Sequence, residues 1–382
     1  MRNAIVFFFF AIIGCGSSHV VARAKLTTTD TPAVPDSPDR VANTTLRIHY
    51  PNADAMSVRG TGPLSWTSSK TARQDDANTF SVSLHADAAF SWKPLIKSNG
   101  NWVWSLGANY TVQPGTTVDI YPRFFTPAGH YELLYSQFVS YLGLRPRDVW
   151  VYYPASYFEN TLATYPVLYM HDGQNLFDPN LAFGGNEWQV DETLQAAEQD
   201  GSIRELLVIG IGNTSDRIAE YTPTPDPDYP DAGWGDTYLK FITSELMPQV
   251  NRQLRVRSDA GSTGIIGSSL GGLISAYAGT VASGTFGVVG VMSPSTWWNN
   301  DWIVAQVAKA SGALPKRVYV DSGDAGDSHD DVTFTAQLAQ AYQQRGFDDT
   351  DLRYTVGHGD QHNEVYWARR LPGALQFLYG PQ

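Results

Sequence analysis

This sequence has a single cysteine, no long apolar run and no excess of basic residues. Cys15 is the single cysteine among 382 residues, so the folded part has neither an internal disulfide nor a thiol nucleophile. No run approaches the roughly 20 apolar residues that a membrane-spanning helix needs. The 38 acidic residues outnumber the 26 basic ones, and the formal charge of −12 opposes binding to nucleic-acid phosphates. We therefore expect no transmembrane domain and no nucleic-acid partner.

The first residues have the pattern of an export signal. Arg2 precedes an apolar stretch from about Ala4 to Ile13, which is too short to span a membrane. Cys15 follows "IIG", a placement that resembles a bacterial lipobox and would make it the lipidated first residue of a mature lipoprotein. The alternative is a plain secretory signal cut near "VARA". We expect residues 1–15 to be a signal peptide and the protein to be exported, either to the cell envelope as a lipoprotein facing the periplasm or the outer membrane, or secreted.

Composition divides the remaining chain into a tether and two folded parts. Residues 16–43 are rich in Thr, Pro, Asp and Ser and too poor in apolar residues to supply a core, which indicates a disordered tether. Over 44–123, short alternating runs such as "TLRIHY" and "FSVSL" are separated by turn residues, which predicts a small all-β sandwich. Over 130–382, buried β-rich runs such as "YPVLYMHD" alternate with amphipathic helices, which predicts an α/β domain with a mostly parallel sheet.

A glycine-framed serine is the main chemical signal. In "TGIIGSSLGG", Ser269 is central to a G-x-S-x-G pattern that runs from Gly267 to Gly271. The preceding apolar residues predict a strand and "LGGLISAYAGTVA" predicts a helix, so Ser269 would occupy a tight strand-to-helix turn. Such a turn exposes the hydroxyl and aims helix N-terminal N–H groups, including that of Leu270, at a developing oxyanion. The alternative is a Gly/Ser loop without chemistry.

A serine nucleophile needs a histidine base and an acid that orients this base. His362 directly precedes the predicted C-terminal helix, and we favour it over His358. The segment "VYVDSGDAGDSHDDVTFT" supplies several aspartates after the penultimate predicted strand, among them Asp324, Asp327 and Asp330. Several carboxylates on one loop could reach the imidazole, so the residues by themselves do not rank them.

With these residues the chain resembles the putative esterase family of α/β-hydrolases, which includes feruloyl and acetyl xylan esterases of carbohydrate esterase family one, esterase D and siderophore esterases. The resemblance spans about residues 130–382 and is carried by "YPVLYMHDGQNLFD", "VIGIGNTSDRIAEYTP", "FITSELMP", "GIIGSSLGGLIS" and "QHNEVYWARRLP". It implies an α/β-hydrolase fold and a set of site residues: Ser269 as nucleophile, His362 as base, Asp330 rather than Asp324 or Asp327 as acid, Gln174 and Leu270 as oxyanion donors, and Trp297 and Trp298 beside the acyl pocket.

The first folded part resembles starch-binding modules of carbohydrate-binding family twenty and related sandwich modules that precede some esterases. The matching stretches are "RGTGPLSW", "FSWKPLIKSNGNWVWSLGANYTV" and "VDIYPRF". The resemblance places Trp66, Lys93, Trp104 and Asn109 where such a module contacts sugar. Tryptophan faces suit the apolar face of a pyranose, and Lys and Asn can bind hydroxyls. The alternative, which we favour, is a module that only packs on the catalytic domain and shapes it.

These observations predict an exported serine esterase that acts on acyl groups of polysaccharides or on phenolic esters. Its partners would be a small-molecule or polysaccharide ester and, through the lipid on Cys15, a membrane. His171 and Asp172 are residue types that bind metals, but no second cluster at ligand spacing accompanies them, so we expect neither metal nor cofactor. Two alternatives remain: an esterase for siderophores or other cyclic esters, and a non-catalytic carbohydrate-binding lipoprotein that keeps the hydrolase scaffold.

Overall fold

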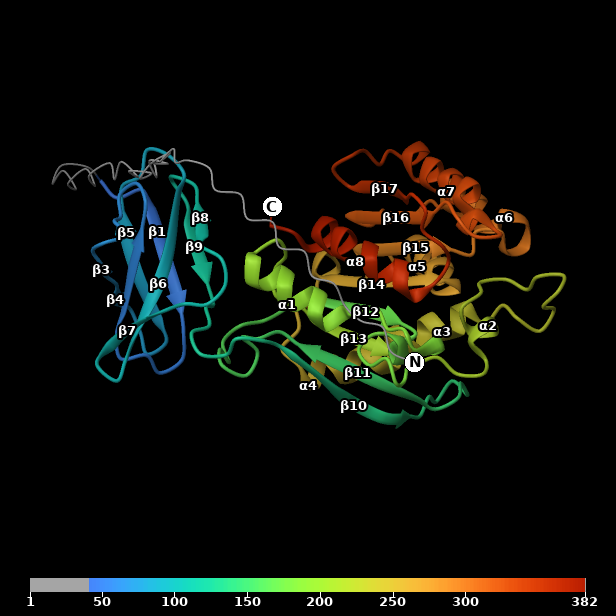
Figure 1. The fold of residues 1–382 in the computed structure, drawn as a ribbon, viewed down its shortest axis with the longest axis horizontal. Coiled ribbons are helices and arrows are strands. Elements are labelled where there is room, and N and C mark those ends of the chain that lie inside the picture. The colour runs from blue at the N-terminus through green and yellow to red at the C-terminus, as the bar shows by residue number, and fades with distance from the viewer. Residues whose placement is uncertain (1–40, 382) are drawn as a thin grey trace, which may run out of the picture.

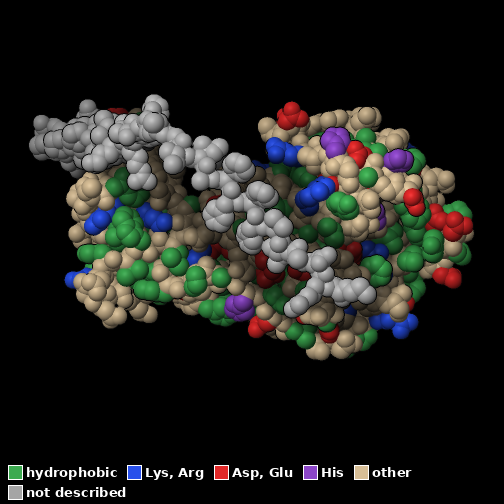
Figure 2. All heavy atoms as spheres, in the orientation of Figure 1, with side chains coloured by type: hydrophobic (Ala, Val, Ile, Leu, Met, Phe, Trp, Pro, Cys, Tyr) green, Lys and Arg blue, Asp and Glu red, His purple; other side chains and the backbone are tan. Residues whose placement is uncertain are grey.

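The computed structural model describes residues 41–381, which form a smaller N-terminal part and a larger C-terminal part (Figure 1). The expected signal peptide, the lipobox-like Cys15 and the tether up to residue 40 lie outside the described residues. Within the described range, every helix is too short or too polar to cross a membrane. Figure 2 shows Lys and Arg side chains interspersed with acidic ones over the described part of one face.

The N-terminal part contains two sheets whose apolar sides share one core. The first sheet has the strand order β4-β5-β1-β9, and the second has the order β3-β2-β6-β7 with β8 also paired to β6. Leu46, Val58, Val82 and Trp92, at most 3% exposed, come from both sheets and join the same hydrophobic cluster. The strands are β1 (Thr44–His49), β2 (Met56–Gly60), β3 (Lys70–Thr71), β4 (Arg73–Gln74), β5 (Thr79–Leu84), β6 (Phe90–Ser98), β7 (Asn101–Trp104), β8 (Tyr110–Val112) and β9 (Thr117–Ile120).

The C-terminal part is built on an eight-stranded mixed sheet with the order β10-β11-β13-β12-β14-β15-β16-β17. The pairs β10–β11 and β11–β13 are antiparallel, and every pair from β13 to β17 is parallel. Its central strands are almost wholly apolar and buried, as a sheet covered on both faces requires. The strands are β10 (His130–Phe138), β11 (Arg147–Tyr153), β12 (Val167–His171), β13 (Leu207–Ile211), β14 (Thr263–Ser269), β15 (Val288–Pro294), β16 (Arg317–Gly323) and β17 (Leu352–Gly357).

Helices cover both faces of this sheet (Figure 1). One hydrophobic cluster packs α3 to α7 on one face, and a second packs α1 and α8 on the other, which gives a three-layer α/β architecture. The α-helices are α1 (Val190–Asp200), α2 (Arg217–Glu220), α3 (Gly235–Phe241), α4 (Met247–Gln253), α5 (Leu270–Val281), α6 (Trp298–Lys309), α7 (Val332–Gln344) and α8 (Glu364–Tyr379). Shorter turns are η1 (Gly173–Asn175), η2 (Phe183–Gly185), the π-turn η3 (Ile242–Leu246) between α3 and α4, η4 (Ala260–Ser262) and η5 (His329–Asp331).

Polar side chains of the larger part hold the segment that joins the two parts. The Glu159 carboxylate accepts hydrogen bonds from the backbone N–H groups of residues 124–126 at 2.5, 3.1 and 2.7 Å. Arg123, 5% exposed, pairs with Glu205 at 3.2 Å. The Asn160 amide donates to the carbonyls of His49 and Pro122. Buried polar groups must be satisfied, so this network fixes the connecting segment against the larger C-terminal part.

Candidate active site

Ser269 is the last residue of β14 and directly precedes α5. Its backbone has φ 58° and ψ −126°, a conformation that a non-glycine residue rarely adopts and that strains the chain. A strained strand-to-helix turn of this kind lifts a side chain out of the sheet at the carboxyl end of its strand. Ser269 Oγ lies 3.3 Å from Ser295 Oγ.

Glycines allow the chain to pack closely around this turn. A Cβ on Gly267 would lie 2.8 Å from both the Gly271 carbonyl carbon and His171 Cδ2. A Cβ on Gly272 would lie 2.8 Å from the Met292 carbonyl oxygen. Real Cβ atoms do not approach backbone this closely, so both positions exclude any larger residue. The glycine pattern in the sequence therefore has a steric cause.

His362 and Asp330 meet, although 32 residues separate them. His362 follows β17 and Asp330 lies in η5 after β16, so two neighbouring parallel strands deliver both side chains to one end of the sheet. His362 Nδ1 lies 2.5 Å from Asp330 Oδ1. Ser269 ends β14 on the same side, two strands from β16. In parallel sheets, binding and catalytic groups gather at this carboxyl edge.

Asp330 is fully buried and held by several donors. Its Oδ2 accepts hydrogen bonds from Ser293 Oγ and the Gly323 N–H, both at 2.5 Å. Burial alone would raise the pKa of the Asp330 carboxyl, but the hydrogen bonds from His362, Ser293 and Gly323 bring it below its usual value. The backbone has φ 46° here, so this contact set also holds a strained residue in place. Asp330 is therefore an anionic group that orients the imidazole.

The other two candidate acids lie elsewhere on the same loop. Asp324 Oδ2 lies 2.7 Å from His358 Nδ1, and its Oδ1 accepts from the Gly359 N–H at 2.7 Å. Asp327 is exposed to solvent. Of the three aspartates that the sequence left open, Asp330 is the one that contacts His362.

Gln174 and Leu270 occupy the first turns of two short segments that start at the edge of the sheet. Gln174 lies in η1 after β12, and Leu270 is the first residue of α5. N–H groups in the first turn of a helix have no acceptor within the helix, so both residues keep a backbone donor that the helix does not use. The Gln174 side chain also accepts a hydrogen bond from the Asn213 N–H at 3.2 Å.

Asp172 fixes the loop that carries Gln174. Its backbone is left-handed, with φ 53°, and its carboxylate accepts two hydrogen bonds from Arg217 at 2.8 Å and one from Asn213 Nδ2 at 2.6 Å. Burial opposes ionisation, but Arg217 and Asn213 outweigh it and lower the pKa of Asp172. Burial also lowers the pKa of the neighbouring His171 to about 3, so that imidazole is neutral. The Asp172 oxygens are thus engaged in structural contacts.

The two adjacent tryptophans occupy different environments. Trp298 is 1% exposed, donates its indole N–H to the Thr224 carbonyl at 2.8 Å and stacks on Tyr229. Trp297 is 45% exposed. Trp298 therefore packs in the core, while much of the Trp297 ring faces solvent.

The predicted sugar-binding residues are only partly brought together. The rings of Trp66 and Trp104 lie 6.1 Å apart, and Trp104 is 37% exposed. Lys93 Nζ instead donates to the Gly107 carbonyl at 2.6 Å, in a loop that approaches α1 of the catalytic part. Asn109 is exposed, and no contact places it beside the two rings.

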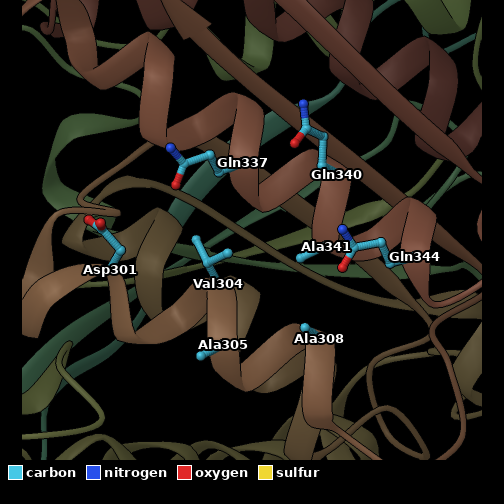
Figure 3. Close-up of a pocket in the computed structure, with 8 residues that line it drawn as sticks. All are labelled: Asp301, Val304, Ala305, Ala308, Gln337, Gln340, Ala341 and Gln344. Atoms are coloured by element: carbon cyan, nitrogen blue, oxygen red, sulfur yellow. The ribbon is translucent and has the colours of Figure 1, made fainter.

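Other features of the described residues lie apart from these groups. A hollow of about 350 Å³ between α6 and α7, lined by residues such as Val304, Ala308 and Gln340, includes none of the predicted site residues (Figure 3). Among residues 41–381, Glu187, Asp191 and Glu192 form a group whose ligand-type oxygens lie within 4.8 Å of one another. Exposed acidic groups of this kind are common without an ion.

Sequence reasoning missed Arg370, whose guanidinium contacts Asp321, Asp360 and Ser293 behind Asp330. A helical spacing signal was available. Arg370 lies three residues after the buried Trp367, on the same face of α8. A charged residue on the buried face of a helix implies buried partners.

Comparisons with known proteins place this fold and site in a family. Residues 142–378 match the model of the family described as "Putative esterase". An uncharacterized protein of Bacillus subtilis, YbbA, is 30% identical over 243 residues, covering 60% of this chain and 91% of its own. A siderophore enterobactin esterase of Emericella nidulans is 36% identical over 98 residues, which is 24% of this chain and 32% of that one.

The fold is also that of a solved hydrolase. The crystal structure of an IroE-like serine hydrolase from Shewanella oneidensis superposes with a TM-score of 0.53 at 21% identity, over 65% of this chain and 80% of the other. At this identity the likeness concerns the fold alone. Together with the family match, which covers more than half of the chain, it gives the assignment: this protein belongs to the putative esterase family and is a hydrolase of ester bonds.

Proposed function

We propose that the protein is a serine esterase that works through an acyl-enzyme. The observation that carries the proposal is the contact between the buried Asp330 and His362. This contact lies at the same edge of the sheet as Ser269, which ends its strand on a strained turn. With Nδ1–H donated to Asp330, a neutral His362 has Nε2 free to accept a proton. Ser269 Oγ attacks the ester carbonyl while its proton passes to Nε2, and the Gln174 and Leu270 N–H groups stabilise the oxyanion.

The acyl-enzyme then forms and breaks down in balanced steps. The imidazolium returns its proton to the leaving alcohol as the carbonyl reforms on Ser269. Water next attacks this ester while His362 takes a proton from the water. His362 then returns the proton to Ser269 Oγ as the carboxylic acid is released. Asp330 stays ionised throughout and holds the imidazole in one tautomer.

The test is hydrolysis of p-nitrophenyl acetate and methyl ferulate by purified parent and by S269A and H362A. Each substitution should lower kcat/KM by at least about 10³-fold. Ser268 is a matched control, because it is adjacent in the same pentapeptide and buried, and S268A should retain most activity. A fluorophosphonate should label the parent and S268A but not S269A. A folded parent that hydrolyses no ester and takes no label would instead favour the non-catalytic carbohydrate-binding alternative.

We propose acylated polysaccharides or phenolic esters as substrates. Support comes from the exposed ring of Trp297 in the catalytic part and from the paired rings of Trp66 and Trp104, whose flat apolar faces suit a sugar ring. The cation beside the oxyanion loop, Arg217, is neutralised by Asp172, so it offers little attraction to a highly anionic substrate.

A cyclic siderophore ester is the second candidate. It is favoured by the 36% identity to an enterobactin esterase over 98 residues. Parallel assays with acetylated xylan, methyl ferulate and enterobactin separate the two. A kcat/KM for enterobactin that exceeds the others by about 100-fold, equivalent to about 2.7 kcal/mol, would assign the siderophore function.

The sequence alone favours a packing role for residues 44–123. Because the rings of Trp66 and Trp104 lie 6.1 Å apart and Trp104 is 37% exposed, we propose that these residues form a β-sandwich module in which the two rings contact sugar. Arg59 lies over the Trp104 ring at 5.4 Å and helps to fix its orientation. Sedimentation with insoluble starch and xylan should therefore retain the parent and release a W66A/W104A double variant. The control Y141A removes a ring that is 94% exposed on the catalytic part and should bind like the parent.

We also propose that the protein is exported and lipid-anchored through Cys15. The proposal rests on the basic and apolar start of the chain and on the residues that precede Cys15. In a bacterial host, radiolabelled palmitate should be incorporated into the parent and not into C15S. Secretion of both forms without label would support a plain signal peptide.

A further inference from the structure

Arg370 lies in α8 behind the active-site acid, where its guanidinium binds three different groups. Its Nε donates to Asp321 Oδ2 at 3.0 Å, its Nη1 to Asp360 Oδ2 at 2.8 Å and its Nη2 to Ser293 Oγ at 2.7 Å. Asp321, Asp330 and Asp360 are each at most 1% exposed. We call Ser293, Asp321, Asp330, Asp360 and Arg370 the Arg370 cluster.

Ser293 connects the guanidinium to the active-site acid. Its hydroxyl accepts from Arg370 and donates to Asp330 Oδ2 at 2.5 Å, while the direct distance from Arg370 Nη2 to Asp330 Oδ2 is 3.7 Å. The other oxygen of Asp330 faces His362 at 2.5 Å. Ser293 itself has φ 37°, a strained conformation that persists because contacts with Asp321, Asp330 and Arg370 hold the residue in place. Successive polar contacts thus connect Arg370, through Ser293 and Asp330, to the imidazole of His362.

Two glycines leave space for the polar side chains of the Arg370 cluster. Gly323 and Gly357 are paired in register at the ends of β16 and β17. A Cβ on Gly323 would lie 2.1 Å from the Asp360 carbonyl oxygen and 3.0 Å from Asp330 Oδ2. A Cβ on Gly357 would lie 2.2 Å from Asp360 Oδ2 and 3.0 Å from Arg370 Cδ. The strand ends are therefore shaped around the Arg370 cluster.

Charge explains why an arginine is needed at this position. Three buried carboxylates disfavour one another's ionisation, and a planar guanidinium offers five N–H donors in a fixed fork, whereas an ammonium offers three on a flexible stem. Asp360 has a second cation, since it also pairs with Arg369, but Arg369 is on the solvent side and 58% exposed. Arg370 thus supplies the buried positive charge for Asp321 and, through Ser293, for Asp330.

We propose, on the basis of the esterase function proposed above, that Arg370 is a positioning residue that acts through Ser293 to keep Asp330 ionised and aimed at His362. Without the charge of Arg370, Asp330 would take up a proton at a higher pH. A protonated Asp330 would no longer orient the His362 imidazole. The reaction would then lose activity most strongly on the acidic side of its pH profile. A purely structural role for Arg370 would instead lower activity by the same factor at every pH.

Several other charged or titratable groups face the cluster and contribute to any pH profile. They are Asp331 and His362 next to Asp330, Glu364 next to His362, and Tyr319 and Arg369 next to Asp321 and Asp360. They are unchanged in R370M, R370K, S293A and D321N/R370M, whereas the controls R369M and H362A each remove one of them.

The first experiment measures kcat/KM against pH for the parent, R370M, R370K and R369M with p-nitrophenyl acetate. For R370M we expect about a tenfold or greater loss at neutral pH, with the acidic limb moved to higher pH by about one unit. R370K keeps a charge without the three-way geometry and should recover part of the shift. R369M removes the neighbouring arginine, which is 58% exposed, and should move the acidic limb much less than R370M does. A uniform loss in R370M with an unmoved limb would overturn the proposal.

The second experiment reads the Asp330–His362 hydrogen bond without any substrate. The bonded Nδ1 proton of His362 should give a far-downfield proton NMR signal that is absent in H362A, and this signal should weaken or move in R370M and S293A. If R370M does not fold, S293A and the charge-balanced D321N/R370M still interrupt the hydrogen bonds that connect Arg370 to Asp330. A parent without esterase activity refutes the proposed function, whereas an unchanged signal in these folded variants refutes the role of Arg370.

Discussion

Two histidine–aspartate pairs lie on the same pair of loops, and the comparison shows what separates a pair with a buried aspartate from a surface one. His362 and Asp330 approach to 2.5 Å, and His358 and Asp324 approach to 2.7 Å. The residue types and the ring nitrogen are the same. The aspartate of the first pair is fully buried, whereas His358 and Asp324 are 86% and 34% exposed.

The difference lies in what stands behind each aspartate. The second oxygen of Asp330 accepts from Ser293 and the Gly323 N–H, and Arg370 lies behind Ser293. The second oxygen of Asp324 accepts from the Gly359 N–H in an exposed loop. Water can replace His358 as a partner of Asp324 at little cost, but it cannot reach Asp330. Burial of the aspartate therefore fixes the orientation of the His362 imidazole, whereas the exposed Asp324 leaves His358 free to move.

The largest expected effect comes from breaking the buried pair. Asp330→Asn keeps the size of the side chain but removes the charge that holds the imidazole in one tautomer, so kcat should fall by about 10³–10⁴-fold. Asp324→Asn is the matched control and should change kcat by less than about twofold. The measurement is steady-state hydrolysis of p-nitrophenyl acetate at neutral pH. Comparable losses in both variants would mean that the two pairs are not functionally distinct.

The buried aspartate should also make the stability of the fold depend on pH. The pKa of Asp330 is depressed in the folded protein, so its contribution is complete above the unfolded pKa of about 3.9 and is lost as pH falls through the lower folded value. Asp330→Asn should therefore lower the free energy of unfolding by about 1–3 kcal/mol at pH 7, and by less in acid below about pH 4. Urea unfolding at several pH values tests this. A difference that grows toward acid would contradict the sign.

Local sequence patterns predicted the parts of this molecule that local physics determines. The turn at Ser269 follows from glycines on both sides of one residue between an apolar strand and a small-residue helix. The covered sheet follows from continuous apolar runs such as β12 and β13. The antiparallel β10 and β11 were not separable from parallel strands, because strand direction depends on connections and not on the residues within a strand.

Long-range contacts were out of reach for the same reason. Asp324, Asp327 and Asp330 are equivalent as residues of one loop, and it is the left-handed turn of η5 together with Ser293, from another strand, that turns Asp330 inward. Trp297 and Trp298 are adjacent in sequence, yet the indole of Trp298 finds a partner at Thr224 and is buried. Such choices are made by tertiary partners between 37 and 74 residues away.

The smallest effect is expected for His358→Ala, which breaks the exposed histidine–aspartate pair. His358→Ala removes an imidazole that is 86% exposed, so the thermal midpoint and kcat should both stay close to those of the parent. Salt gives an independent measurement, because at about 1 M the Debye length is about 3 Å and an exposed pair is screened, whereas a buried one is not. Parent and H358A should therefore keep similar kcat values as salt rises. If H358A instead loses activity in proportion to D330N, the loop of residues 358–362 transmits the surface contact to His362, and burial alone does not separate the two pairs.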